Sequence, residues 1–102
     1  MAKQKHPSAT VELSDSGLSF SGVMNHQSVP KLIAHLPKYE HNPAVLDISQ
    51  VSKIDSAGLA FLIDWGNQNL SDNNPISLRG ASKQAQQMIN IMGLDGVFEL
   101  LN

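Results

Sequence analysis

The sequence predicts an α/β fold with a mixed four-stranded sheet and three or four helices. Short segments that alternate polar and apolar residues, or that are apolar throughout, are separated by segments with helical spacing. Their order is strand, strand, helix, strand, helix, strand, helix, followed by a short apolar tail. Helices that follow strands are typical of parallel neighbours joined by right-handed crossovers. The chain has 102 residues and is 41% hydrophobic, which suits one domain with its own core.

The first two elements are predicted to form an antiparallel hairpin. Residues 10–14 (TVELS) and 18–23 (LSFSGV) alternate in polarity, and the turn-forming residues Asp15, Ser16 and Gly17 lie between them. We expect residues 1–8 to be a flexible N-terminus and residues 9–102 to be a single domain.

The third and fourth elements are a helix and a central strand. Ser28 is the expected helix cap and Pro37 ends the helical pattern. Its apolar positions are Val29, Leu32, Ile33 and Leu36. The apolar run 44–48 (AVLDI) predicts a strand in the middle of the sheet that is buried on both faces. We expect this strand to end at Ile48 or Ser49, with a short loop after it.

The second half of the chain predicts a helix, a strand and a helix. Asp55 or Ser56 caps a helix that runs to about Leu70, and residues 76–78 form a further strand. Ser82 caps a third helix that stops at Gly93, with one face made by Ala85, Met88, Ile89 and Met92. The tail 94–101 has an apolar face that either covers the sheet edge or packs on a partner.

Composition narrows the possible partners and compartments. A net charge of −2 and a pI near 6.0 give no positive field for nucleic acid or anionic lipid. The chain has no cysteine, which is consistent with a reducing compartment. The polar N-terminus lacks a signal-peptide core, and the longest apolar run is far shorter than the roughly 20 residues that cross a bilayer. We expect a cytoplasmic protein without direct membrane insertion.

No pattern in the sequence indicates catalysis, a metal or a cofactor. The four histidines lack metal-ligand spacing, and the glycines form none of the usual nucleotide-binding fingerprints. Ser56 has no nucleophile elbow and no histidine tied to it by pattern. Asp47 and Asp55 form an acid and base pair only in principle, and we interpret the chain as a non-enzyme.

The segment 45–62 (VLDISQVSKIDSAGLAFL) carries the most information. A buried strand is followed by an acid and a hydroxyl at a helix start whose first turn contains Gly58. Such a helix start favours a capping carboxylate or an anion. The strand, the loop and the motif DSAGLA resemble the signature of the STAS domain, which is found in bacterial anti-sigma-factor antagonists and in anion transporter tails. The element order of the whole chain is similar to that family, which implies a non-catalytic domain that binds a partner protein.

Ala57 separates two branches of that family. In the anti-sigma-factor antagonists, the hydroxyl residue that a kinase phosphorylates stands immediately before the glycine, where this chain has Ala57. The pattern here resembles instead the MlaB-type STAS subunit of the Mla phospholipid transport system, with Ser56 as the hydroxyl residue of the helix start. That resemblance implies an ABC transporter ATPase as partner and a peripheral place at the inner membrane. The alternative is an anti-sigma-factor antagonist with a kinase partner, for which Ser56 is the phosphorylation candidate.

The helical wheel of the second helix predicts the docking face. Leu59, Leu62, Ile63, Gly66 and Leu70 share the arc that we expect to face the core. Phe61 lies on the opposite arc with Trp65 at its flank, and exposed aromatic residues are enriched at interfaces. The alternative for Trp65 is packing under a neighbouring helix. The predicted partner-binding residues are Asp55, Ser56, Ala57, Gly58, Phe61 and Trp65, and we expect Phe61→Asp to leave the fold intact.

Overall fold

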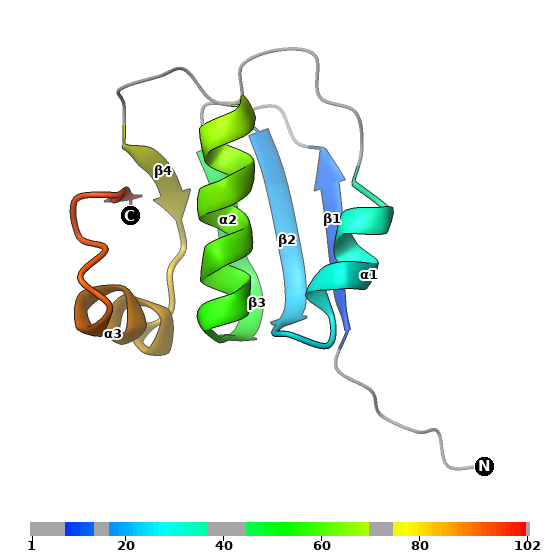
Figure 1. The fold of residues 1–102 in the computed structure, drawn as a ribbon, viewed down its shortest axis with the longest axis horizontal. Helices are drawn as coiled ribbons and strands as arrows, with labels where there is room; N and C mark the ends of the chain where they lie inside the picture. The colour runs from blue at the N-terminus through cyan, green and yellow to red at the C-terminus, as the bar shows by residue number, and fades with distance from the viewer. Residues whose placement is uncertain (1–7, 14–16, 37–44, 70–74, 102) are drawn as a thin grey trace.

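The computed structural model describes residues 8–13, 17–36, 45–69 and 75–101, which form five strands and three helices. The strands are β1 (Ala9–Leu13), β2 (Gly17–Met24), β3 (Val45–Ile54), β4 (Ile76–Arg79) and β5 (Phe98–Leu101). The helices are α1 (Val29–Ala34), α2 (Ser56–Asn69) and α3 (Lys83–Ile91), arranged as Figure 1 shows. The predicted α/β class and the predicted order of elements are confirmed.

All the strands form one mixed sheet in the order β1-β2-β3-β4-β5. β1 pairs antiparallel with β2, which confirms the predicted hairpin, and every other neighbouring pair is parallel. The sheet has a fifth strand where four were expected, because the apolar tail pairs with β4 and places Phe98 opposite Ile76. The tail therefore extends the sheet, and β3 lies at its centre as predicted.

Helices cover one face of the sheet, and the other face carries polar side chains. Buried side chains of all three helices belong to one core cluster with the strands, and α2 lies in front of β3 in Figure 1. On β2, Leu18 and Phe20 are fully buried, whereas Ser19 between them is only half-buried. At its start β3 is buried on both faces as predicted, because the adjacent residues Val45 and Leu46 are both buried, whereas beyond the predicted run Ser49 and Gln50 are exposed.

β3 is longer than the sequence pattern suggested. The loop expected after Ile48 or Ser49 is strand as far as Ile54, which pairs with Met24 at the end of β2. Val51 and Ile54 are both buried at a spacing of three residues, which breaks the period-2 pattern of a regular strand. The pairing with β2 shifts register between Gly22 and Val23. The extension therefore depends on irregular strand pairing, which an alternating pattern of polar and apolar residues does not predict.

The ends of α3 agree with the sequence. The Ser82 Oγ accepts a hydrogen bond from the Ala85 N–H at 3.0 Å, which confirms this N-cap. Gly93 has a φ of 71°, the left-handed conformation that commonly ends helices. Ala85 is buried but Met92 is 42% exposed. The predicted apolar face is therefore buried only in the earlier turns of the helix.

Several predictions concern parts of the chain outside the described residues. They are the flexible N-terminus before Ser8, the turn at 14–16, the loop 38–43 and the helix end at Leu70. Within the described residues, no helix is long and apolar enough to span a membrane.

Candidate partner-binding site

Asp55 joins the start of α2 to the loop that follows β2. Its Oδ1 accepts a hydrogen bond from the Gly58 N–H at 3.0 Å, which confirms the predicted helix cap. Its Oδ2 accepts a hydrogen bond from the His26 N–H at 3.3 Å and lies 3.7 Å from the His26 Nδ1. One carboxylate therefore fixes two segments that lie 29 residues apart in the sequence.

Gly58 brings α2 against the end of β2. A Cβ at this position would lie 2.7 Å from the Met24 carbonyl oxygen and 2.6 Å from the Ile54 Cγ1. The Met24 carbonyl also accepts a hydrogen bond from the Asp55 N–H at 3.0 Å. Glycine is thus required by close approach, since any side chain would push the helix start away from the strand.

The loop from Asn25 to Ser28 is held by its own side chains. The Asn25 Oδ1 accepts hydrogen bonds from the Gln27 and Ser28 N–H groups at 2.9 and 3.0 Å. The buried Ser28 Oγ donates to the Val23 carbonyl at 2.5 Å and accepts from the Asn25 N–H at 3.0 Å. Ser28 is the N-cap residue of α1 as predicted, but its hydroxyl bonds the preceding loop and makes no cap hydrogen bond to the helix.

A contact from α3 completes the site, and the sequence pattern did not reveal it. The Gln84 side-chain amide bonds both the N–H and the carbonyl of Ile54, at 3.2 and 2.7 Å. A glutamine near a helix start has no distinctive signal when its partner lies 30 residues away. The site therefore lies at the carboxyl-terminal ends of β2 and β3. The loop after β2 and the starts of α2 and α3 meet there. Carboxyl ends of parallel strands commonly form binding sites.

The exposure predicted for Phe61 and Trp65 is wrong. Each is 8% exposed and belongs to the core cluster, and the Phe61 ring packs edge-on against Phe20 with centroids 5.9 Å apart. The wheel placed them opposite Leu59 and Leu62, but α2 contacts more than the sheet: it also packs beside α1. The buried part of its circumference is therefore wider than the single arc that the wheel assigned to the core. Trp65 therefore packs in the interior, as in the alternative weighed for it.

Among the side chains of α2 that the structure describes, the exposed ones form a narrow row of short or polar residues. We call it the exposed stripe, and it consists of Ser56, Ala60, Asp64 and Asn67. Ser56 is exposed at the first helical position, and the neighbouring Ala57 is half-buried. Of the predicted site residues, the structure brings Asp55, Ser56, Ala57 and Gly58 together at the helix start. Ala60 was not predicted, although its spacing of four from Ser56 indicates the same helix face.

A small hollow with a largely apolar lining lies at this end of the sheet. Val23, Met24, Asn25, His26, Lys53 and Asp55 line a cavity of about 220 Å³. The exposed His26 imidazole and the partly exposed Asp55 carboxylate lie at its rim. Within the described part of the chain, no group of three or more histidine, aspartate or glutamate residues could hold a metal ion.

The chain was compared with families of known proteins, with curated proteins and with solved structures. A family model described as "Mlab, STAS domain" matches residues 8–102. No curated protein and no solved structure matches the chain significantly.

Proposed function

The chain belongs to the MlaB-type STAS domain family, and we propose that it is a regulatory or scaffolding subunit of a phospholipid ABC transporter. In this proposal it binds the ATPase of a Mla-type system that maintains outer-membrane lipid asymmetry, and it sits at the inner membrane through that partner. STAS domains are generally non-catalytic binding domains. ATP hydrolysis and lipid movement then belong to the partner proteins.

The observation that carries the proposal is the ordered start of α2 with its short exposed side chains. Ser56 and Ala60 are exposed one helical turn apart, and short side chains allow a partner helix to approach closely. The helix start is held by the Asp55 carboxylate and by close packing at Gly58. A surface that is already ordered loses little conformational entropy on binding. The proposed docking surface is therefore the exposed stripe together with His26.

Affinity capture tests this function. The tagged chain is incubated with its native cytosol and solubilised membranes, and the retained proteins are identified by mass spectrometry. The proposal predicts recovery of an ABC-type ATPase with its permease by the wild-type chain and by Asn90→Arg, a control on the exposed surface of α3. Ala60→Arg should lose both proteins. Equal recovery by Ala60→Arg would contradict the proposed docking surface.

An anti-sigma-factor antagonist is the alternative function, and the exposure of Ser56 favours it. A phosphate at the first position of a helix interacts favourably with the unpaired N–H groups and the positive end of the dipole. Under this alternative, the same capture recovers a kinase-like anti-sigma factor in place of the ATPase. Phosphate on Ser56 is then expected in the chain isolated from its native source.

A further inference from the structure

The outer edge of β1 is open for pairing. Among the described residues, β1 pairs with β2 alone and ends the sheet on that side. The Ser8 carbonyl accepts a hydrogen bond from the Val23 N–H at 2.7 Å. Backbone direction alternates along a strand, so Ala9 and Val11 direct their N–H and C=O groups away from β2. These groups are available to a further strand.

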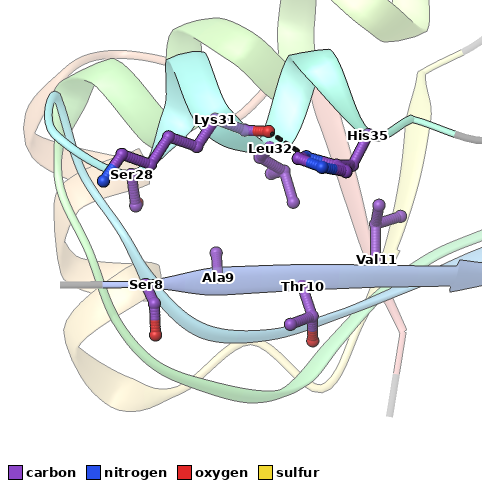
Figure 2. Close-up of a pocket in the computed structure, with 8 residues that line it drawn as sticks. All are labelled: Ser8, Ala9, Thr10, Val11, Ser28, Lys31, Leu32 and His35. Carbon is purple, nitrogen blue, oxygen red and sulfur yellow. Dashed lines mark hydrogen bonds between the residues drawn. The ribbon is translucent and has the colours of Figure 1, made fainter. Parts of the chain in front are cut away.

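A cavity lies directly beside this edge, between β1 and α1 (Figure 2). Its volume is about 420 Å³, which is large enough for more than one side chain. It is lined by Ser8, Ala9, Thr10, Val11, Ser28, Lys31, Leu32 and His35. In Figure 2, Ala9 and Val11 point toward the helix, whereas Ser8 and Thr10 point away from it.

The cavity reaches the backbone of β1 as well as one of its faces. A strand presents only alternate side chains to one side, yet four consecutive residues, 8–11, line this cavity. An extended chain paired with β1 would therefore lie at the cavity mouth and direct every second side chain into it. This combination of open strand edge and adjoining pocket is how domains that bind peptides by strand addition obtain affinity and specificity.

The charge of the cavity indicates what the added chain carries. Lys31 is exposed, lines the cavity and makes no ion pair with any described residue. The His35 Nδ1 bonds the Lys31 carbonyl at 3.0 Å, which holds the imidazole beside the cavity (Figure 2). Ala9, Val11 and Leu32 supply the apolar part of the lining. A carboxylate near an apolar side chain complements this arrangement.

We propose that the groove between β1 and α1 binds an extended segment of a partner protein by strand addition to β1. Every second side chain of the segment enters the cavity, where apolar side chains flank one carboxylate that pairs with Lys31, and the intervening side chains are polar. This groove involves β1 and α1 and none of the exposed stripe of α2, so the inference does not rest on the proposed function.

Nuclear magnetic resonance titration of the full chain tests the inference. The probe is the blocked peptide TVTETVT, which presents its valines and its glutamate on one face, and its basic counterpart TVTKTVT is the matched control. We expect the acidic peptide to shift the backbone amide signals of Ala9 and Val11 and to bind at least about tenfold more tightly than the basic one. Lys31→Glu should reverse that preference, while Lys83→Glu, on the exposed start of α3, should leave it unchanged.

Ala9→Pro separates strand addition from other occupants. Proline removes an N–H that points away from β2, so the β1–β2 ladder is kept while the open edge is blocked. Dispersed amide signals will establish that the variant is folded, and we expect it to lose peptide binding. Unchanged peptide binding by Ala9→Pro would overturn the inference. So would the absence of any shift at millimolar peptide, or tighter binding of octanoate than of the peptide at the same residues.

Discussion

The side-chain amide of Gln84 pairs with the backbone of Ile54 as a neighbouring strand would. The Gln84 Nε2 donates to the Ile54 carbonyl at 2.7 Å, and its Oε1 accepts from the Ile54 N–H at 3.2 Å. Ile54 is the last residue of β3 and directly precedes the helix cap Asp55. The contact therefore holds α3 against the strand end that positions the start of α2.

Replacing Gln84 with leucine should lower the free energy of unfolding by about 1 to 3 kcal/mol, because the Ile54 N–H and carbonyl lose their partner in a partly buried place. Urea denaturation followed by circular dichroism measures this change. Gln87→Leu, at an exposed position of the same helix, is the control and should change stability little. Equal effects of the two variants would show that the amide contact does not stabilise the fold.

Gly58→Ala should destabilise the chain by about 1 to 3 kcal/mol, even though alanine favours helices over glycine by about 1 kcal/mol. The added methyl group would meet the Met24 carbonyl, a backbone atom that cannot rotate away. Gly96→Ala is the matched control, since nothing lies within 4 Å of the Cβ position there. Thermal unfolding of both variants checks this, and a stable Gly58→Ala would refute the close approach of α2 to β2.

Phe61→Ala should lower the free energy of unfolding by about 3 to 5 kcal/mol, the usual cost of removing a buried aromatic side chain. The ring is 8% exposed and packs on Phe20. Phe61→Asp should unfold the domain, because it buries an unpaired charge, and this reverses the expectation drawn from the helical wheel. Ala60→Asp, at the adjacent exposed position, should remain folded, as the dispersion of amide proton signals will show.

The sequence pattern predicted the strands, the helices and the helix start because these depend on local chemistry. The alternation of polar and apolar residues predicted the hairpin, which the structure contains. Asp55 was one of the two residues predicted to cap α2, and its hydrogen bond to Gly58 confirms it. What it missed depends on contacts between distant segments. The fifth strand forms because the tail pairs with the neighbouring strand β4, which places Phe98 opposite Ile76. Phe61 is buried because Phe20 and the neighbouring elements surround a helix face that the wheel assigned to solvent.

The candidate site was predictable in part for the same reason. Asp55 and Gly58 lie three residues apart in a short motif and interact within one helical turn. His26 and Gln84 join that site from other elements, at separations of 29 and 30 residues. No local pattern links residues at such separations, so their contribution required the structure.

Ser56→Glu should weaken binding of the proposed ATPase while leaving stability within about 0.5 kcal/mol of the wild type. The side chain is exposed, and a negative charge in the first turn of a helix is favourable for the helix itself. In the complex, however, the carboxylate would be desolvated against the partner. Pull-down with the purified ATPase measures binding, and urea denaturation measures stability. Undiminished binding would remove Ser56 from the docking surface.

Site-specific crosslinking tests the central claim most directly. The chain has no cysteine, so Ala60→Cys labelled with benzophenone maleimide gives one photoreactive position on the exposed stripe of α2. Asn90→Cys, on the exposed surface of α3, provides the control position. The account predicts that illumination in native membranes joins Ala60→Cys, but not Asn90→Cys, to the ATPase of an ABC transporter. Crosslinking of a kinase-like regulator, or equal crosslinking from both positions, would contradict it.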